Sequence, residues 1–299
     1  MFTLSVVATK GGVGKTTIAA HLAGLFRDIG LRVLLIDADV QPSLSKFFVI
    51  DHVAPRGLTD MITRGYLEED CISTVQLPPA GFSGSAARIE TTGHIDIVMS
   101  DTTDGRLQDW MFQHPDYIVR IRMAIKSLMA SSYDIVIIDT QGAVGHLQDA
   151  AVVASDTVVA PASPDIISAR EFLAGTNRLL ERIQSAANLG LHVPPVKALL
   201  NRFENTNDSR LMTGLIRDQM PNMAGHVYLM ETEVPSAVAF RKAATARVPV
   251  HWIDPHRCGD VMHRLMWELL PSLDGRYAPN HRNHSHVPGA VDAAQAQKD

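Results

Sequence analysis

The sequence predicts an α/β fold, a three-layer arrangement in which helices flank a doubly wound, mostly parallel sheet. The main observation is that short aliphatic runs alternate along the chain with amphipathic stretches, the pattern of the βα units that build parallel sheets. The runs lack polar alternation, as expected of strands that are buried on both faces. The composition agrees, because 46% hydrophobic and 20% charged residues are typical of globular domains and not of disordered chains.

Six aliphatic runs are expected to form strands, and two weaker candidates lie near Val227 and Val250. The six runs cover residues 4–8, 32–37, 95–99, 134–139, 157–160 and 196–200. Apolar residues at helical spacing between these runs predict helices, most clearly over 18–29, 118–128 and 172–183. We expect the apolar stripes of these helices to pack in the core.

A chain of 299 residues is long enough for one large domain, and residues 1–273 are expected to form it. From residue 274 onward the composition turns to Asn, His, Ala and Gln without periodicity, so 274–299 is expected to be a flexible tail. The segment 77–93 is rich in Pro, Gly and Ser and is expected to be a surface loop.

Composition also excludes several classes of protein. Two cysteines, Cys71 and Cys258, are too few for a disulfide framework or for a cysteine-ligated metal site within one chain. No apolar run is long enough to cross a membrane and no secretory signal opens the chain, so a cytoplasmic protein is expected. The net charge of −5 excludes a globally basic nucleic-acid binder, but residues 241–264 carry five basic and two acidic side chains.

The most informative segment is KGGVGKTT at residues 10–17, which follows one predicted strand and precedes a predicted helix. Its glycines let consecutive backbone N–H groups point inward, and the helix N-terminus adds partial positive charge, so the segment can cradle phosphates. Lys15 can reach the β- and γ-phosphates, and the Thr16 hydroxyl can ligate Mg²⁺. The expected phosphate-binding residues are Lys10, Gly11, Gly12, Val13, Gly14, Lys15, Thr16 and Thr17.

This segment departs from the general pattern GxxxxGK[ST] in two ways, because Thr9 replaces the first glycine and Lys10 adds a second lysine. In this form it resembles the deviant Walker A motif of the ParA/MinD superfamily. The resemblance implies a P-loop NTPase fold, ATP and Mg²⁺ as ligands, and a homodimer in the ATP state in which Lys10 reaches the nucleotide across the interface. A lysine from each side would offset the repulsion between two nucleotides that face each other.

Acidic residues follow two of the predicted strands, at the edge of a parallel sheet where ligands bind. Asp37 and Asp39 follow one aliphatic run, and Asp139 ends another. The first pair resembles the switch segment D-x-D-P-Q of the family, with Val40 in place of proline. The resemblance implies that Asp39 orients the attacking water and that Asp37 supports the magnesium shell. The alternative is that both aspartates only cap a helix over 42–48.

Asp139 resembles a Walker B aspartate, which holds Mg²⁺, although Gln141 stands where the family has proline and leaves the hydrolysis rate open. Asn201 and Arg202 follow the run 196–200, and by the same resemblance they recognise the nucleotide base. The expected catalytic residues are thus Lys10, Lys15 and Asp39, and the expected metal ligands are Thr16, Asp37 and Asp139. Matching segments extend from residue 2 to about residue 273.

Shared ATPase machinery leaves three functions open. One is a ParA-type (Soj-like) partition ATPase, whose ATP-bound dimer associates with the nucleoid by binding double-stranded DNA non-specifically and is stimulated by a ParB-type partner. A second is a MinD-like membrane-associated ATPase. The third is a weakly hydrolysing adaptor of a polar, secretion or conjugation apparatus.

The sequence favours the partition ATPase. The chain ends in AVDAAQAQKD, which lacks the bulky apolar face of a membrane-binding helix, so no membrane partner is expected. The basic residues of 241–264 can contact DNA phosphates, and a dimer doubles their number; they are Arg241, Lys242, Arg247, Arg257 and Arg264. His251, His256 and His263 could add charge. The phosphate loop begins near residue 10, so no helix-turn-helix module is expected before it.

Overall fold

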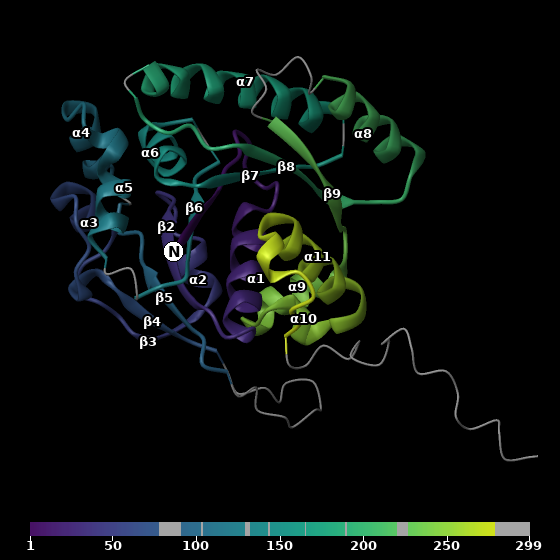
Figure 1. Cartoon of the computed structure of the whole chain (residues 1–299), viewed down its shortest axis with the longest axis horizontal. Helices are drawn as coiled ribbons and strands as arrows, with labels where there is room; N and C mark the ends of the chain where they lie inside the picture. Colours follow the sequence, from purple (N-terminus) through teal and green to yellow (C-terminus); the bar gives the residue numbers. More distant parts are fainter. Residues whose placement is uncertain are drawn as a thin grey trace, which may run out of the picture.

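The computed structural model describes residues 1–77, 91–102, 104–128, 132–142, 144–164, 166–188, 190–219 and 227–278. In this part of the chain a single sheet of nine strands runs through the middle of the molecule (Figure 1). The strands are β1 (Phe2–Val6), β2 (Arg32–Ala38), β3 (Val49–His52), β4 (Ser73–Gln76), β5 (His94–Val98), β6 (Ile135–Thr140), β7 (Thr157–Ala162), β8 (Val196–Phe203) and β9 (Val227–Pro235).

The sheet order is β3-β4-β5-β2-β6-β1-β7-β8-β9. All neighbouring strands are parallel except the pairs β3·β4 and β4·β5, which are antiparallel. The order reverses direction around β1, which is the mark of a doubly wound sheet and places a ligand site at the carboxyl ends of the central strands. The predicted fold class is therefore confirmed.

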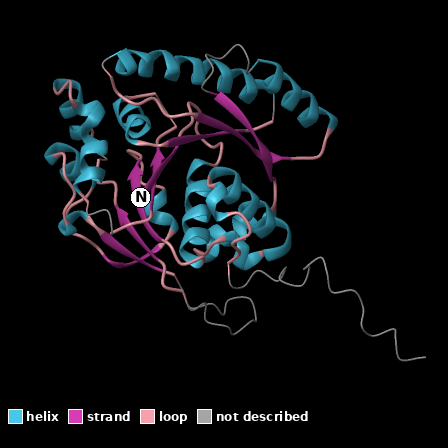
Figure 2. Cartoon of the chain, viewed as in Figure 1, coloured by secondary structure: helices cyan, strands magenta, loops and turns pink. Residues whose placement is uncertain are grey.

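Helices cover both faces of the sheet (Figure 2). One face carries α1 (Lys15–Asp28), α2 (Leu44–Phe47), α9 (Val238–Ala246), α10 (Val250–Ile253) and α11 (Asp260–Leu269). The other carries α3 (Leu58–Arg64), α4 (Arg106–Gln113), α5 (Tyr117–Ser127), α6 (His146–Ala154), α7 (Ile166–Asn188) and α8 (Asn207–Gln219). Short turns of helix span Glu69–Cys71, Pro255–Gly259 and Pro271–Leu273. None of the helices in the described ranges is both long and apolar enough to cross a membrane.

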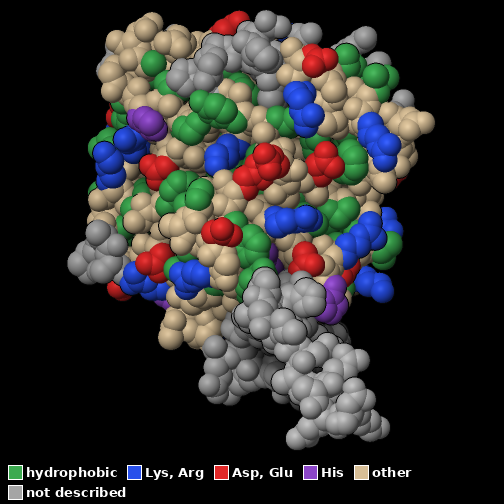
Figure 3. Space-filling view, turned by 45° about the vertical axis from the view of Figure 1, so that its right-hand side comes forward, with side chains coloured by type: hydrophobic (Ala, Val, Ile, Leu, Met, Phe, Trp, Pro, Cys, Tyr) green, Lys and Arg blue, Asp and Glu red, His purple; other side chains and the backbone are tan. Residues whose placement is uncertain are grey.

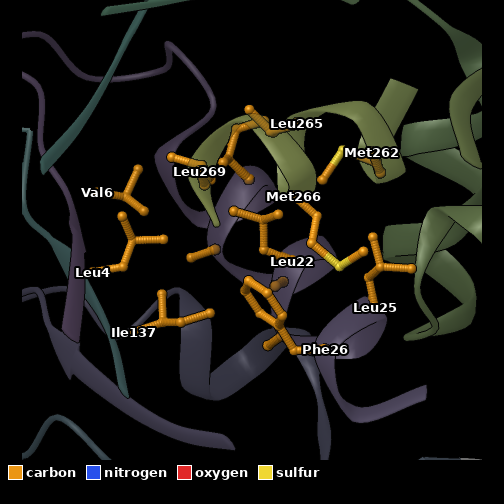
Figure 4. Packing of buried hydrophobic residues seen from close by; sticks show 14 of the residues in the cluster. Leu4, Val6, Leu22, Leu25, Phe26, Ile137, Met262, Leu265, Met266 and Leu269 are labelled. Atoms are coloured by element: carbon orange, nitrogen blue, oxygen red, sulfur yellow. The ribbon is translucent and has the colours of Figure 1, made fainter. Parts of the chain in front are cut away.

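The core on the first face joins segments that lie far apart in the sequence (Figure 4). Side chains of β1 and β6 meet those of α1 and α11, with Phe26 of α1 fully buried among them. The apolar face of α11 is buried in this cluster, so the amphipathic pattern of the last helix serves packing. Because α1 packs between the sheet on one side and α11 on the other, the phosphate loop at its N-terminus has a rigid support.

Three expectations about the elements need correction. The segment at Val250 is the short helix α10, not a strand, because it follows Pro249, whose fixed φ suits the start of a helix. The strands β3 and β4 were not expected. Residues 274–278 of the expected tail pack on the domain, because the buried Ala278 donates its N–H to Nε2 of His263 at 3.0 Å.

Two other expected segments fall largely outside the described residues. Most of the loop expected over 77–93 does so, because positions 78–90 are not described. The rest of the expected tail, 279–299, is also outside them.

Candidate nucleotide-binding site

The phosphate loop connects the end of β1 to the start of α1. Gly14 is the N-cap of α1 and has φ 94°, a left-handed conformation that a residue with a Cβ rarely adopts. Among the described residues no side chain caps this helix, and no acidic residue lies in its first turn. The first N–H groups of α1 therefore remain available to an anion, as in helix N-termini that bind phosphate.

Two distant segments hold the loop in place. Gly142, just after β6, lies so close that a Cβ there would approach Cα of Gly11 to 2.8 Å. Asn201, at the end of β8, is buried and its Nδ2 donates to the carbonyl oxygen of Val13 at 2.7 Å. The loop is thus braced from β6 on one side and from β8 on the other.

The two strand-end carboxylates are neighbours, because Asp37 pairs with Asp139 in the register of β2 and β6. Both residues are fully buried. The Thr16 hydroxyl donates to Oδ2 of Asp139 at 2.6 Å. Oδ2 of Asp37 accepts from the backbone N–H and the hydroxyl of Ser45, at 2.8 and 2.6 Å. The structure therefore brings together all three expected metal ligands.

The remaining oxygens of these carboxylates fit a magnesium ion. Oδ1 of Asp37 and Oδ1 of Asp139 are buried and have no hydrogen-bond partner within the described residues. Burial raises the pKa of Asp139 to about 8 and that of Asp37 to about 6, against the hydrogen bonds from Thr16 and Ser45. A bound cation would offset the energetic cost of burying two charged carboxylates.

The described part of the chain contains no cluster of three or more His, Cys, Asp or Glu side chains that could form a complete metal cage. Mg²⁺ typically uses one or two carboxylates and takes its other ligands from phosphates and water.

Lys15 lies at the carboxylate pair, and its exposed fraction is only 7%. Burial lowers the pKa of Lys15, although the charges of Asp139 and Asp39 oppose this shift. A nucleotide phosphate would provide the charge partner that the buried ammonium needs. Lys10 lies further out, where its Nζ contacts Oε2 of Glu171 at 2.9 Å, with both side chains about half exposed.

Asp39 is more accessible than Asp37. Its Oδ1 accepts from the N–H of Gln41 at 2.9 Å, and its carbonyl oxygen accepts from the Ser100 hydroxyl at 2.5 Å. The residue is half-buried, so its carboxylate borders both the solvent and the site. This position suits a group that orients water.

A cavity of about 390 Å³ opens on the other side of the loop, at the ends of β8 and β9. Its lining includes the loop residues Gly14 and Thr17 together with Asn201 and Arg202. Arg202 has φ 61°, an uncommon left-handed conformation for a side-chain-bearing residue. The remaining lining comes from the segment after β9 and from α9: Pro235, Ser236, Ala237, Phe240, Arg241 and Ala244.

Three of the five basic residues of 241–264 line two cavities that share Pro235. All five are exposed, but Arg241 lines the cavity beside the phosphate loop, whereas Arg257 and Arg264 line a second cavity of about 470 Å³ with Trp267 and Glu233. On the face in Figure 3, Lys and Arg side chains are interspersed with Asp and Glu. The DNA-binding role of these residues stays a prediction.

Two of the histidines in the same segment cannot add to that surface. His251 is buried, and its Nε2 contacts Oδ2 of Asp28 at 2.8 Å. His263 is fully buried, with Nδ1 2.8 Å from the carbonyl oxygen of Gly259. His256 is exposed.

Sequence reasoning missed several residues of the site. Ser45 holds Asp37, Gly142 contacts the loop, and Phe240 lines the cavity. The signal for Ser45 was its place in the helix over 42–48 that the aspartates were expected to cap in the alternative interpretation, and the signal for Gly142 was its place just after Asp139. Nothing in the sequence indicated Phe240.

The geometry defines the class of protein: a P-loop domain on a doubly wound sheet, with a buried lysine and paired carboxylates placed for a magnesium-bound nucleotide. Residues 1–192 match the AAA domain family AAA_31. The chain therefore belongs to this family, within the ParA/MinD superfamily of P-loop ATPases.

Individual relatives are distant. A chromosome partitioning protein ParA from Caulobacter vibrioides is 28% identical over 248 residues, covering 83% of this chain and 85% of the relative. A Rhizobium rhizogenes relative is 29% identical over 219 residues, which are 72% of this chain but only 54% of the length of that protein. The ATP complex of a McdA variant from Cyanothece superposes with a TM-score of 0.69 at 20% identity, covering 90% of this chain and 95% of McdA.

Proposed function

We propose that this protein is a partition ATPase, which dimerises with ATP, binds DNA non-specifically and moves a plasmid, a chromosome or a mobile element together with a ParB-type partner. The observation that carries the proposal is the convergence of Lys15, Thr16, Asp37 and Asp139 at one braced phosphate loop. The name of the Caulobacter relative supports the partition role.

The residues divide the chemistry among them. The N–H groups of the loop and the Lys15 ammonium bind the phosphates, while Thr16, Asp37 and Asp139 would hold Mg²⁺, which neutralises charge on the phosphates when it is bound. Asp39 orients the attacking water from the solvent side of the site. Hydrolysis of this kind depends on positioning and charge more than on covalent chemistry, so buried and braced groups are suited to it.

Lys10 is proposed to act between protomers. Its side chain is 41% exposed and pairs with Glu171 at the surface, so it can exchange this partner for a phosphate of a second nucleotide. DNA binding is proposed to follow dimerisation, because a dimer doubles the number of basic residues of 241–264 that can contact phosphates. A partner protein is proposed to accelerate an otherwise slow hydrolysis and so release the DNA.

Fluorescence anisotropy with a labelled duplex of arbitrary sequence tests this proposal, using the wild-type chain with ATP or ADP and Lys15→Ala as the control. We expect salt-sensitive binding with ATP, little with ADP and none for the variant. If DNA does not bind with ATP but the protein sediments with liposomes, the membrane function is supported instead. If it binds neither, the adaptor function is supported.

The catalytic assignment is tested separately. Asp39→Ala is expected to keep ATP-dependent dimerisation, measured by light scattering after size-exclusion chromatography, and to lose phosphate release. Unchanged turnover in this variant would remove Asp39 from the catalytic role.

A further inference from the structure

The order of the strands fixes the direction in which a nucleotide crosses the site. Asp37 and Asp139 lie at the ends of β2 and β6, so the metal-bound end of the triphosphate lies there. The 390 Å³ cavity lies at the ends of β8 and β9, on the other side of β1 and β7. A triphosphate bound at the loop therefore directs its ribose and base into this cavity.

Two adjacent side chains of α9, Phe240 and Arg241, line the cavity. The Phe240 ring packs against the buried His21 of α1, with ring centroids 5.3 Å apart, so its position is supported from behind. Arg241 is exposed, and within the described ranges no carboxylate forms an ion pair with it. Its guanidinium is therefore available to a ligand in the cavity.

Of the two residues expected to recognise the base, Arg202 lines the cavity and Asn201 is partly engaged elsewhere. Asn201 donates through Nδ2 to the carbonyl oxygen of Val13 and lies against Gly14, where a Cβ would meet Nδ2 at 2.2 Å. One of its two amide hydrogens thus serves the phosphate loop. Arg241 is a second arginine in this lining, and its planar cation is suited to the base because it stacks on aromatic faces.

We propose that Arg241 contacts the base and ribose of the bound nucleotide and is not part of the DNA-binding surface. This inference rests on the proposed function, because it concerns the same ATP site. It assigns the expected DNA contacts to the remaining basic residues, of which Lys242 is adjacent to Arg241 but does not line the cavity.

The test compares Arg241→Ala with Lys242→Ala, two neighbouring exposed positions of one helix. Isothermal titration calorimetry with the non-hydrolysable analogue AMPPNP and Mg²⁺ gives the Kd of each. We expect Arg241→Ala to raise the Kd about threefold or more over that of Lys242→Ala, the effect of one cation–π contact at a partly exposed site. Arg241→Lys, which keeps the charge without the planar group, is expected to recover only part of the affinity.

A second arm measures duplex DNA affinity by anisotropy with each variant saturated with AMPPNP. Arg241→Ala is expected to bind DNA like the wild type once it is saturated. A ratio of AMPPNP Kd values below threefold overturns the proposal, and so does weaker DNA binding by saturated Arg241→Ala than by the saturated wild type. If the wild type binds AMPPNP but no DNA, the partition function fails while the assignment of Arg241 is still decided by the ratio. If the wild type does not bind AMPPNP, both fail.

Discussion

The phosphate end of the site and the basic surface of the C-terminal helices were both predicted from short sequence segments, but only in the first are the predicted residues joined by strand register and by a hydrogen bond. At the phosphate end, Lys15, Asp37 and Asp139 converge because each lies at the carboxyl end of a strand or the start of the helix that follows one. Of the basic residues of 241–264, Arg241 lies on α9, Arg257 in the turn Pro255–Gly259 and Arg264 on α11, and no strand register joins them. The topology of a parallel sheet brings strand-end residues together. A count of charges along the sequence does not show how the basic residues are arranged in space.

The largest expected effect comes from Lys15→Ala. The buried ammonium has no substitute at the carboxylate pair, so we expect the affinity for ATP to fall about 100-fold, as for the loss of a strong charge-assisted bond. Calorimetry with AMPPNP measures this loss. Lys46→Ala, at an exposed lysine of α2, is the control and should bind normally.

Asn201→Ala tests whether the loop depends on its brace. The change leaves the carbonyl oxygen of Val13 without its donor, and we expect about tenfold weaker nucleotide binding, the typical effect of an unpaired buried polar group. Asn205→Ala, a few residues beyond β8, should leave the Kd unchanged. Equal affinities for the two variants would show that the loop holds its shape without Asn201.

His21 links the two regions, because its ring contacts both Phe47 of α2 and Phe240 of α9. Burial, with a smaller contribution from the charge of His251, lowers the pKa of His21 to about 3. The unfolded chain therefore binds a proton near pH 6.5 that the folded chain does not, so stability is present at neutral pH and is lost as the pH falls below 6.5.

Between about pH 7.5 and about pH 5.5 this residue is expected to remove about 1.4 kcal/mol from the free energy of unfolding. His21→Asn, whose amide oxygen can still accept from the N–H of Val250, should lack this contribution. Denaturant unfolding of both proteins at the two pH values gives the difference. Asp37 and Asp139 titrate in both proteins, so their contributions to the pH dependence cancel in the difference between wild type and variant. An identical pH dependence in the two proteins would contradict the lowered pKa.

The smallest effect is expected on the C-terminal surface. Replacing Arg257 and Arg264 by alanine should weaken DNA binding several-fold and reduce the slope of log K against log salt by about 0.9 for each phosphate that the protein no longer neutralises. Anisotropy at several salt concentrations measures the slope. The double variant Arg106→Ala, Lys126→Ala changes exposed basic residues on the opposite face and should have the wild-type slope. A wild-type salt slope for the variant that lacks Arg257 and Arg264 would show that DNA binds to another surface.

The sequence predicted the central strands well because their burial on both faces imposes continuous aliphatic runs, as in Ile135–Thr140. The edge strands Val49–His52 and Ser73–Gln76 were missed because they are short and partly exposed, so their composition is mixed. At Val250 the β-branched residue suggested a strand, but Pro249 before it begins a helix.

The site was predictable where a residue acts through a local motif and not where it acts through a distant contact. Thr16 belongs to the phosphate-loop motif, and Asp139 ends an aliphatic run in the manner of a Walker B aspartate. The bond between Asn201 and Val13 joins residues that are 188 positions apart, and the contact of Phe240 with His21 depends on how α9 packs on α1. Neither leaves a pattern in one sequence.

The ends of β2 and β6 and the start of α1 are proposed to form one site for a magnesium-bound nucleotide. The most direct measurement is the Kd for AMPPNP with Mg²⁺ and with EDTA, for the wild type and for Asp139→Asn. We expect the wild type to bind about tenfold more weakly in EDTA and the variant to bind equally under both conditions. If Asp139→Asn shows the same dependence on Mg²⁺ as the wild type, the metal is not held by Asp139 and the account is wrong.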